Sequence, residues 1–138
     1  MAIHLDEPVA SQAPDPRWWR PATILLAAAI FMQAVFAGAM LSGFDWARAA
    51  HAANALVVVV ASAAASLAAT VTLRRSQNGR RLAFVLFGLT VVVLVQFVLG
   101  RMAAKGANLM WAHVPLGVML AGFAGQAVAG ARKLGEER

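Results

Sequence analysis

The sequence has no cysteine and few charges. Its 138 residues include no Cys, and only 13% of them are charged. The absence of cysteine excludes disulfide bonds, thiolate metal ligands and covalent haem attachment through a Cys-x-x-Cys-His motif. A soluble domain is typically about half apolar and about a quarter charged, whereas 61% of this chain is hydrophobic. The composition therefore lies outside the range of soluble globular domains.

Carboxylates are also scarce, and none falls inside a long apolar segment. The acids are Asp6, Glu7, Asp15, Asp45, Glu136 and Glu137. Proton relays and ion-coupled transporters usually need a carboxylate within the membrane, so this distribution argues against both. Zinc takes four protein ligands, or three and a water, and the apolar segments lack the residues to complete such a set.

Long apolar segments are what the chain has in excess. Four of them approach the roughly 20 residues that a helix needs to cross a bilayer, at about 22–43, 49–73, 82–101 and 109–131. They predict an all-α membrane protein, with a bundle of four transmembrane helices over residues 21–132. Residues 1–20 are expected to form a polar N-terminal tail, and residues 133–138 a short C-terminal tail.

Basic residues are distributed unevenly around these segments. One face of the predicted bundle carries Arg17, Arg20, Arg74, Arg75, Arg80, Arg81, Arg132, Lys133 and Arg138. Only Arg48, Arg101 and Lys105 flank the other face. Basic residues in short flanks mark the cytoplasmic side, so both termini are predicted to be cytoplasmic, in a bacterial inner membrane. Trp18 and Trp19 are expected to anchor that side at the interface.

The net charge of +6 is explained by this topology. Lys and Arg beside the ends of apolar segments contact anionic membrane lipid. Nucleic-acid binding is therefore not expected, and membrane lipid is the first predicted partner.

Rare polar residues recur at matching places in the two halves of the chain. The first half has Gln33, Gly38 and His51, and the second has Gln96, Gly100 and His113. Each histidine stands 13 residues after its glycine, and one residue is inserted between glutamine and glycine in the first half. Both halves enter from the same side, which predicts a parallel two-helix repeat about an axis along the membrane normal.

The predicted topology places His51 and His113 at similar depth, on helices that face each other diagonally. Polar residues within a membrane are candidates for function, and bundle cores are common cofactor sites. Two imidazoles can hold a haem iron axially, so the pair predicts a non-covalently bound haem b. A single histidine at this depth can instead hydrogen-bond to its neighbours or to water.

Three further groups of residues are candidates for the same site. Cations that would pair with haem propionates, or would be ordinary loop charges, are Arg48, Arg101 and Lys105. Residues that would accept the second N–H of a ligating histidine are Gln33, Gln96 and Asn54. Glycines that would leave room for a flat macrocycle are Gly38, Gly100 and Gly117. For any one glycine, plain helix packing is the simpler explanation.

Two short motifs carry a family resemblance. The stretch Gln96–Gly100, followed by Ala112-His113-Val-Pro-Leu-Gly117, resembles one half of a haem A synthase. That family has two four-helix bundles, each with a histidine pair on its second and fourth helices, and His51 and His113 match such a pair. The resemblance covers about residues 22–131, extends to small stand-alone four-helix bacterial membrane proteins, and implies a haem-binding bundle.

The chain departs from the family pattern at identifiable places. Arg48 stands about one turn before His51, where the family has an acidic residue tied to catalysis. The outer-loop cysteine pair of the family is missing, and the sequence corresponds to one bundle of the two. These departures favour holding a haem over modifying it, and a redox carrier over a stand-alone enzyme.

The predicted function is therefore electron transfer by a bis-histidine haem b protein. Quinol or another membrane redox protein is the expected partner, or else the chain is a haem-bearing subunit of a larger membrane complex. Two alternatives stay open. One is a haem-free accessory subunit, and the other is a small transporter or lipid-pocket protein whose histidines line a polar cavity.

Overall fold

The computed structural model describes residues 16–136 and is built from four long helices. A short 3-10 turn, η1 (Pro16–Trp18), leads into α1 (Trp19–Leu41), α2 (Asp45–Thr72), α3 (Gln77–Ala104) and α4 (Met110–Glu136). Each of the four long helices has the length and the apolar composition to cross a membrane. The prediction of an all-α four-helix bundle is thus confirmed, and the chain is a multi-pass membrane protein.

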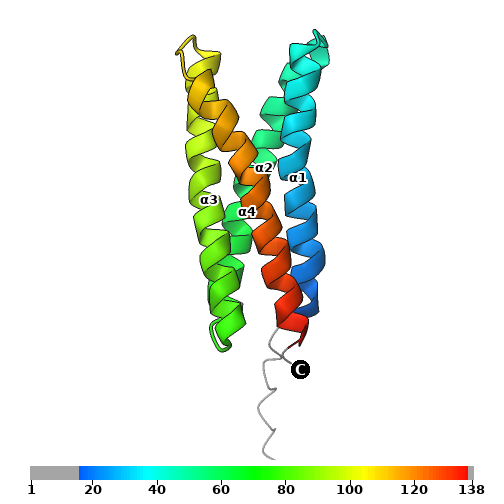
Figure 1. Ribbon diagram of the computed structural model, residues 1–138, viewed down its shortest axis with the longest axis vertical. Helices are drawn as coiled ribbons and strands as arrows, with labels where there is room; N and C mark the ends of the chain where they lie inside the picture. Colours follow the sequence, from blue (N-terminus) through cyan, green and yellow to red (C-terminus); the bar gives the residue numbers. More distant parts are fainter. Residues whose placement is uncertain (1–15, 137–138) are drawn as a thin grey trace, which may run out of the picture.

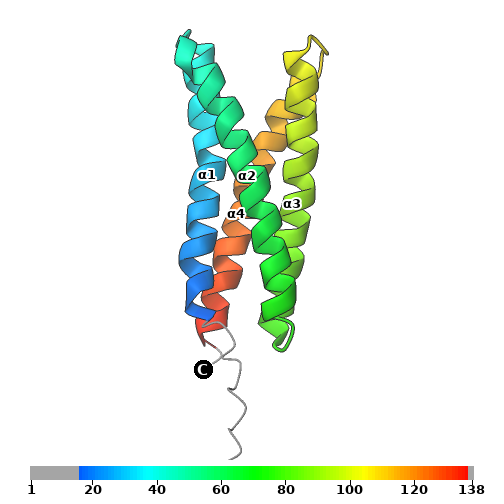
Figure 2. The same ribbon diagram turned by 180° about the vertical axis from the view of Figure 1, so that it is seen from behind.

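The helices form an up-and-down bundle in which each packs against two neighbours. Helices α1 and α3 both lie beside α2 and α4, while the diagonal pairs make no close backbone contact within the described residues. Figures 1 and 2 show two hairpins, α1–α2 and α3–α4, that cross each other. After the half turn between the two views, each hairpin takes the place of the other, so the arrangement has an approximate twofold likeness.

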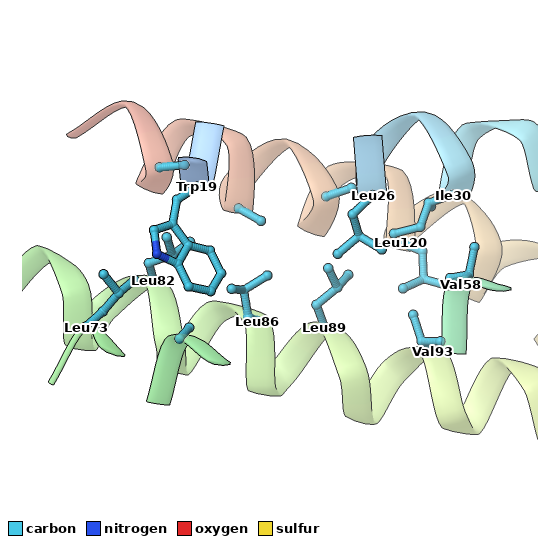
Figure 3. Packing of buried hydrophobic residues seen from close by; sticks show 14 of the residues in the cluster. Trp19, Leu26, Ile30, Val58, Leu73, Leu82, Leu86, Leu89, Val93 and Leu120 are labelled. Atoms are coloured by element: carbon cyan, nitrogen blue, oxygen red, sulfur yellow. The ribbon is translucent and has the colours of Figure 1, made fainter. Parts of the chain in front are cut away.

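Packing is concentrated in the half of the bundle where α1 begins and α4 ends. Its buried hydrophobic side chains are Trp19, Leu26, Ile30, Val58, Ala69, Leu73, Leu82, Leu86, Leu89, Val93, Leu120, Ala124, Ala127, Ala131 and Leu134. Figure 3 shows the larger of these side chains pointing toward one another from neighbouring helices. We call this set the packed end of the bundle.

The opposite end, which carries the α1–α2 and α3–α4 loops, is much less packed. Between Ile30 and Val58, and between Val93 and Leu120, Ala47 is the one buried residue. The two hairpins diverge there, at the top of Figures 1 and 2. We call it the open end.

Small polar residues connect the helices inside the packed half. The Thr90 hydroxyl of α3 lies 2.9 Å from the Ser62 carbonyl of α2 and 2.8 Å from the carbonyl of Leu86. Ser62 is fully buried. A polar group in hydrocarbon must find its partner within the protein, and short side chains let two helix backbones approach closely. Between α2 and α3, Thr90 finds its partner in a backbone carbonyl of α2, and the short side chain of Ser62 allows the two helices to approach closely.

The helices extend beyond the segments predicted from apolar composition. Helix α3 begins five residues before the predicted start at 82, where the Ser76 hydroxyl accepts a hydrogen bond from Gly79 N at 2.9 Å. Helix α4 continues to Glu136, through part of the expected C-terminal tail, and α1 starts inside the expected N-terminal tail. Residues 1–15 of that tail lie outside the described part. Helical hydrogen bonds do not require apolar side chains, so a helix continues through polar residues at the interface.

The two adjacent tryptophans at the start of α1 differ from each other. Trp18 is 74% exposed, as an interfacial anchor would be, but Trp19 is only 9% exposed and packs in the core. Successive residues of a helix point about 100° apart. Trp19 therefore packs against the other helices, while Trp18 faces outward.

The uneven packing predicts an uneven sensitivity to truncation. Leu86→Ala at the packed end should lower the free energy of unfolding by about 2 kcal/mol, because it leaves a cavity that its neighbours cannot fill. Leu94→Ala, two turns along α3 and 45% exposed, should cost less than about 1 kcal/mol, since the removed atoms faced outward. Unfolding in mixed micelles, followed by circular dichroism, measures both. Equal losses would contradict the uneven packing.

Candidate functional site

His51 is held against α1 by one nitrogen of its ring. Nδ1 of His51 lies 3.2 Å from the carbonyl oxygen of Gln33. Three residues later on α2, the Asn54 amide donates to the carbonyl of Ala29 at 2.8 Å. Ala29 and Gln33 are four residues apart on α1, so two polar side chains of α2 bind successive turns of its neighbour. This pair of contacts fixes the register of the hairpin and the position of the imidazole.

The side chain of Gln33 offers His51 a second hydrogen-bond arrangement. With its amide nitrogen turned toward α2, that nitrogen lies 3.0 Å from Nδ1 and 3.1 Å from the carbonyl oxygen of His51, and its oxygen lies 2.7 Å from Ala55 N. An amide that donates to Nδ1 requires the ring proton on Nε2. A ring that donates from Nδ1 to the Gln33 carbonyl keeps a free lone pair on Nε2, which is the form that binds a metal.

His113 lies against a glycine of the neighbouring helix. A Cβ added at Gly100 of α3 would lie 2.9 Å from Cε1 of His113, so glycine is what leaves space for the ring. Gln96, one turn earlier, donates to the backbone oxygen of His113 at 2.7 Å. A Cβ at Gly117 would lie 3.0 Å from the same Gln96 nitrogen. These four residues thus form one contact group between α3 and α4.

Two polar atoms of this contact group are buried and unpartnered. Within residues 16–136, Nδ1 of His113 and Oε1 of Gln96 have no hydrogen-bond partner. A buried polar atom without a partner costs about 1–3 kcal/mol. In a native protein such an atom indicates a site that is completed by a ligand, a water or a small movement.

The fold places the two histidines at the same end of the bundle, on diagonal helices. His51 on α2 and His113 on α4 are both half-buried. The two helices that carry them, α2 and α4, lie diagonally across the bundle and have no close backbone contact within the described residues. No cluster of three or more His, Asp or Glu side chains occurs in residues 16–136. The possible metal ligands in these residues are therefore the two histidines, without a third His, Asp or Glu side chain in the same cluster.

The cations predicted to hold propionates lie near the open end. Arg48, Arg101 and Lys105 are exposed, and none forms an ion pair within the described part of the chain. Arg48 lines a small hollow at the α1–α2 turn together with Phe44 and Asp45. The structure thus leaves these side chains free to move, and it shows no contact between them and the histidines.

Not every predicted residue joins the histidines. Gly38 is exposed, and a Cβ added there would meet nothing within 4 Å, so it does not repeat the role of Gly100. Asn54 binds the backbone of α1 and not a ring. Sequence reasoning did not foresee the Ala29 carbonyl as its partner, although the spacing of His51 and Asn54 places both side chains on one face of a helix.

The chain matches no protein-family model, no curated protein and no solved structure. The resemblance to haem A synthases therefore stays a prediction from sequence. Among the described residues, the feature that could coordinate a metal is the pair of imidazoles on diagonal helices.

The two glycines of the repeat make a matched pair of variants. Gly100→Ala should displace the His113 ring and lower the free energy of unfolding by about 1–3 kcal/mol, because the added methyl overpacks the contact. Gly38→Ala should be neutral, or stabilising by up to about 1 kcal/mol, since alanine is the better helix former. Unfolding measurements and the NMR signals of the His113 imidazole distinguish the two. The contact between Gly100 and His113 would be refuted if the His113 signal shifted in Gly38→Ala, or if it did not shift in Gly100→Ala.

Proposed function

We propose that the protein binds one haem b non-covalently, with His51 and His113 as the two axial ligands. The observation that carries the proposal is the pair itself: two half-buried imidazoles near the starts of the diagonal helices α2 and α4. They belong to the open end, where the hairpins diverge and few side chains are buried. A flat macrocycle between two diagonal helices requires such a separation.

The hydrogen bonds around the rings support axial ligation. A ligating histidine usually donates its second N–H to a carbonyl or a carboxylate, and Nδ1 of His51 already lies beside the Gln33 carbonyl. On the other helix, Nδ1 of His113 and Oε1 of Gln96 both lack a partner. A turn of the Gln96 amide toward the ring would pair these two atoms. Nε2 of each ring would then be the atom left to hold a haem iron.

A haem with two imidazole ligands supplies one-electron redox chemistry without an open coordination position. The residues of the chain would fix the two ring planes and exclude a third ligand. Arg48, Arg101 and Lys105, exposed near the same end, are the proposed partners of the propionates. The haem would exchange electrons with quinol or another membrane redox protein, alone or within a larger complex.

The proposed setting is a bacterial inner membrane with both termini in the cytoplasm. The excess of basic residues at the packed end supports this orientation, and places the histidines toward the outer face. The likeness of the two hairpins in Figures 1 and 2 supports a parallel two-helix repeat. An exchange partner would then approach from the outer leaflet or from the outer aqueous side.

Visible spectroscopy tests the haem proposal directly. The protein, expressed with ample haem and purified in detergent, should show the sharp reduced bands of six-coordinate b-type haem after dithionite is added. His51→Ala and His113→Ala should each abolish this spectrum, because each removes an axial ligand. His4→Ala, a change at the third histidine of the chain, is the control and should leave it intact. A colourless wild-type protein would refute haem binding.

Binding of carbon monoxide tests whether both axial positions of the haem are filled, which is a separate question from whether haem is bound. The reduced wild-type protein should not bind carbon monoxide readily, since both axial positions are filled. Ready binding by a coloured protein would overturn bis-histidine ligation while leaving the haem in place. Binding should appear in any His51→Ala or His113→Ala protein that still retains haem.

The lack of cysteine allows the orientation to be measured with single introduced thiols. Asn108→Cys lies in the α3–α4 loop and Gln77→Cys at the start of α3, and both positions are exposed. A membrane-impermeant maleimide should label Asn108→Cys in intact cells, but Gln77→Cys only after the membrane is permeabilised. The reverse pattern would place both termini outside.

A further inference from the structure

A groove of about 200 Å³ lies on the bundle surface between the start of α3 and the end of α4. It is at the packed end, far from the histidines. Its polar lining residues are Asn78, Arg81, Gln126 and Lys133. Its apolar lining residues, which we call the floor of the groove, are Leu82, Val85, Ala129 and Gly130. The groove therefore joins a charged rim to an apolar floor on the outside of a membrane bundle.

The charge of the groove is of one sign. Arg81 and Lys133 are exposed, and neither forms an ion pair within residues 17–136. No carboxylate belongs to its lining. The Asn78 amide lies 3.5 Å from the carbonyl of Lys133, a long contact that ties the two helix ends together. Two cations from different helices thus border one hollow, and no carboxylate of the described residues pairs with either of them.

The side chain of Gln126 gives a second feature of the groove, which is independent of its charge. Its side chain is exposed, it has no hydrogen-bond partner among the described residues, and it lies seven residues before Lys133. Seven helical residues rise about 10 Å, so this amide sits deeper along the membrane normal than the cation. A polar group at such a depth must be satisfied by something other than bulk water.

We propose that the groove binds one anionic phospholipid. Its phosphate would lie between Arg81 and Lys133, its glycerol region would cover Val85 and Ala129, and an ester carbonyl would accept a hydrogen bond from Gln126. Basic pockets between transmembrane helices at the cytoplasmic side are suited to anionic headgroups. Along α4 from its end, the lining residues follow in the order Lys133, Ala129 and Gln126, so a headgroup at the cation and a deeper ester carbonyl at the amide would both find a partner.

Lipid titration of the full-length protein in an uncharged detergent tests the proposal. Native mass spectrometry should show one phosphatidylglycerol bound more tightly than phosphatidylcholine. Arg81→Gln and Lys133→Gln should each weaken phosphatidylglycerol binding about fivefold, the effect of losing one cation beside an anionic headgroup. Arg75→Gln removes an equal charge from the adjacent loop, outside the groove, and should change the affinity little. An equal loss in that control would show diffuse attraction and overturn the site.

A second variant tests whether lipid binding depends on the shape of the groove as well as on its charge. Ala129→Phe fills the floor while both cations remain, and it should abolish the tightly bound lipid. Ala121→Phe, at another exposed position of α4, is the control and should retain it. Excess inorganic phosphate should not displace phosphatidylglycerol from the wild type. Displacement by phosphate, or full binding by Ala129→Phe, would refute a lipid site. Circular dichroism checks that each variant is folded.

Discussion

The structure depends on one constraint: a polar group inside a hydrocarbon layer must find its partner within the protein. Continuous helices satisfy the backbone, and three polar side chains donate to backbone carbonyls of neighbouring helices. Asn54 reaches Ala29 across the first hairpin, Thr90 reaches Ser62 between the hairpins, and Gln96 reaches His113 across the second. These contacts set the register of adjacent helices, which apolar packing alone does not do, because lipid tails are as apolar as leucine. The histidines occupy their positions because of this network.

The composition of the interior changes along the bundle axis, and the packing follows it. At the packed end, interlocking leucines fill the space between the helices. Toward the open end the corresponding interior positions hold an amide, an imidazole or a glycine, as at Gln33, His51 and Gly100, and these leave the space incompletely filled. The low burial and the divergence of the hairpins are therefore consequences of the same residues that are proposed to hold the haem.

Much of the fold was predictable from the sequence, because four apolar segments with charged flanks allow few arrangements. The diagonal placement of His51 and His113 followed from helix order alone. Three features were not predictable. The ends of the helices depend on capping and on polar residues that a count of apolar residues overlooks, as at Ser76. The inward direction of Trp19 depends on the rotation of α1 about its axis. The difference between Gly38 and Gly100 depends on which helix face meets the neighbour, and the one-residue insertion changes that face by about 100°.

Each histidine is secured entirely within its own hairpin, His51 by α1 and His113 by α3. The distance between the rings therefore depends on the angle between the two hairpins, which pack against each other through the leucines of the packed end. A small change in that angle would widen or narrow the gap without breaking a hydrogen bond to either ring. A flat molecule that enters from the side of the bilayer would therefore change this angle while each ring keeps its contact with its own hairpin.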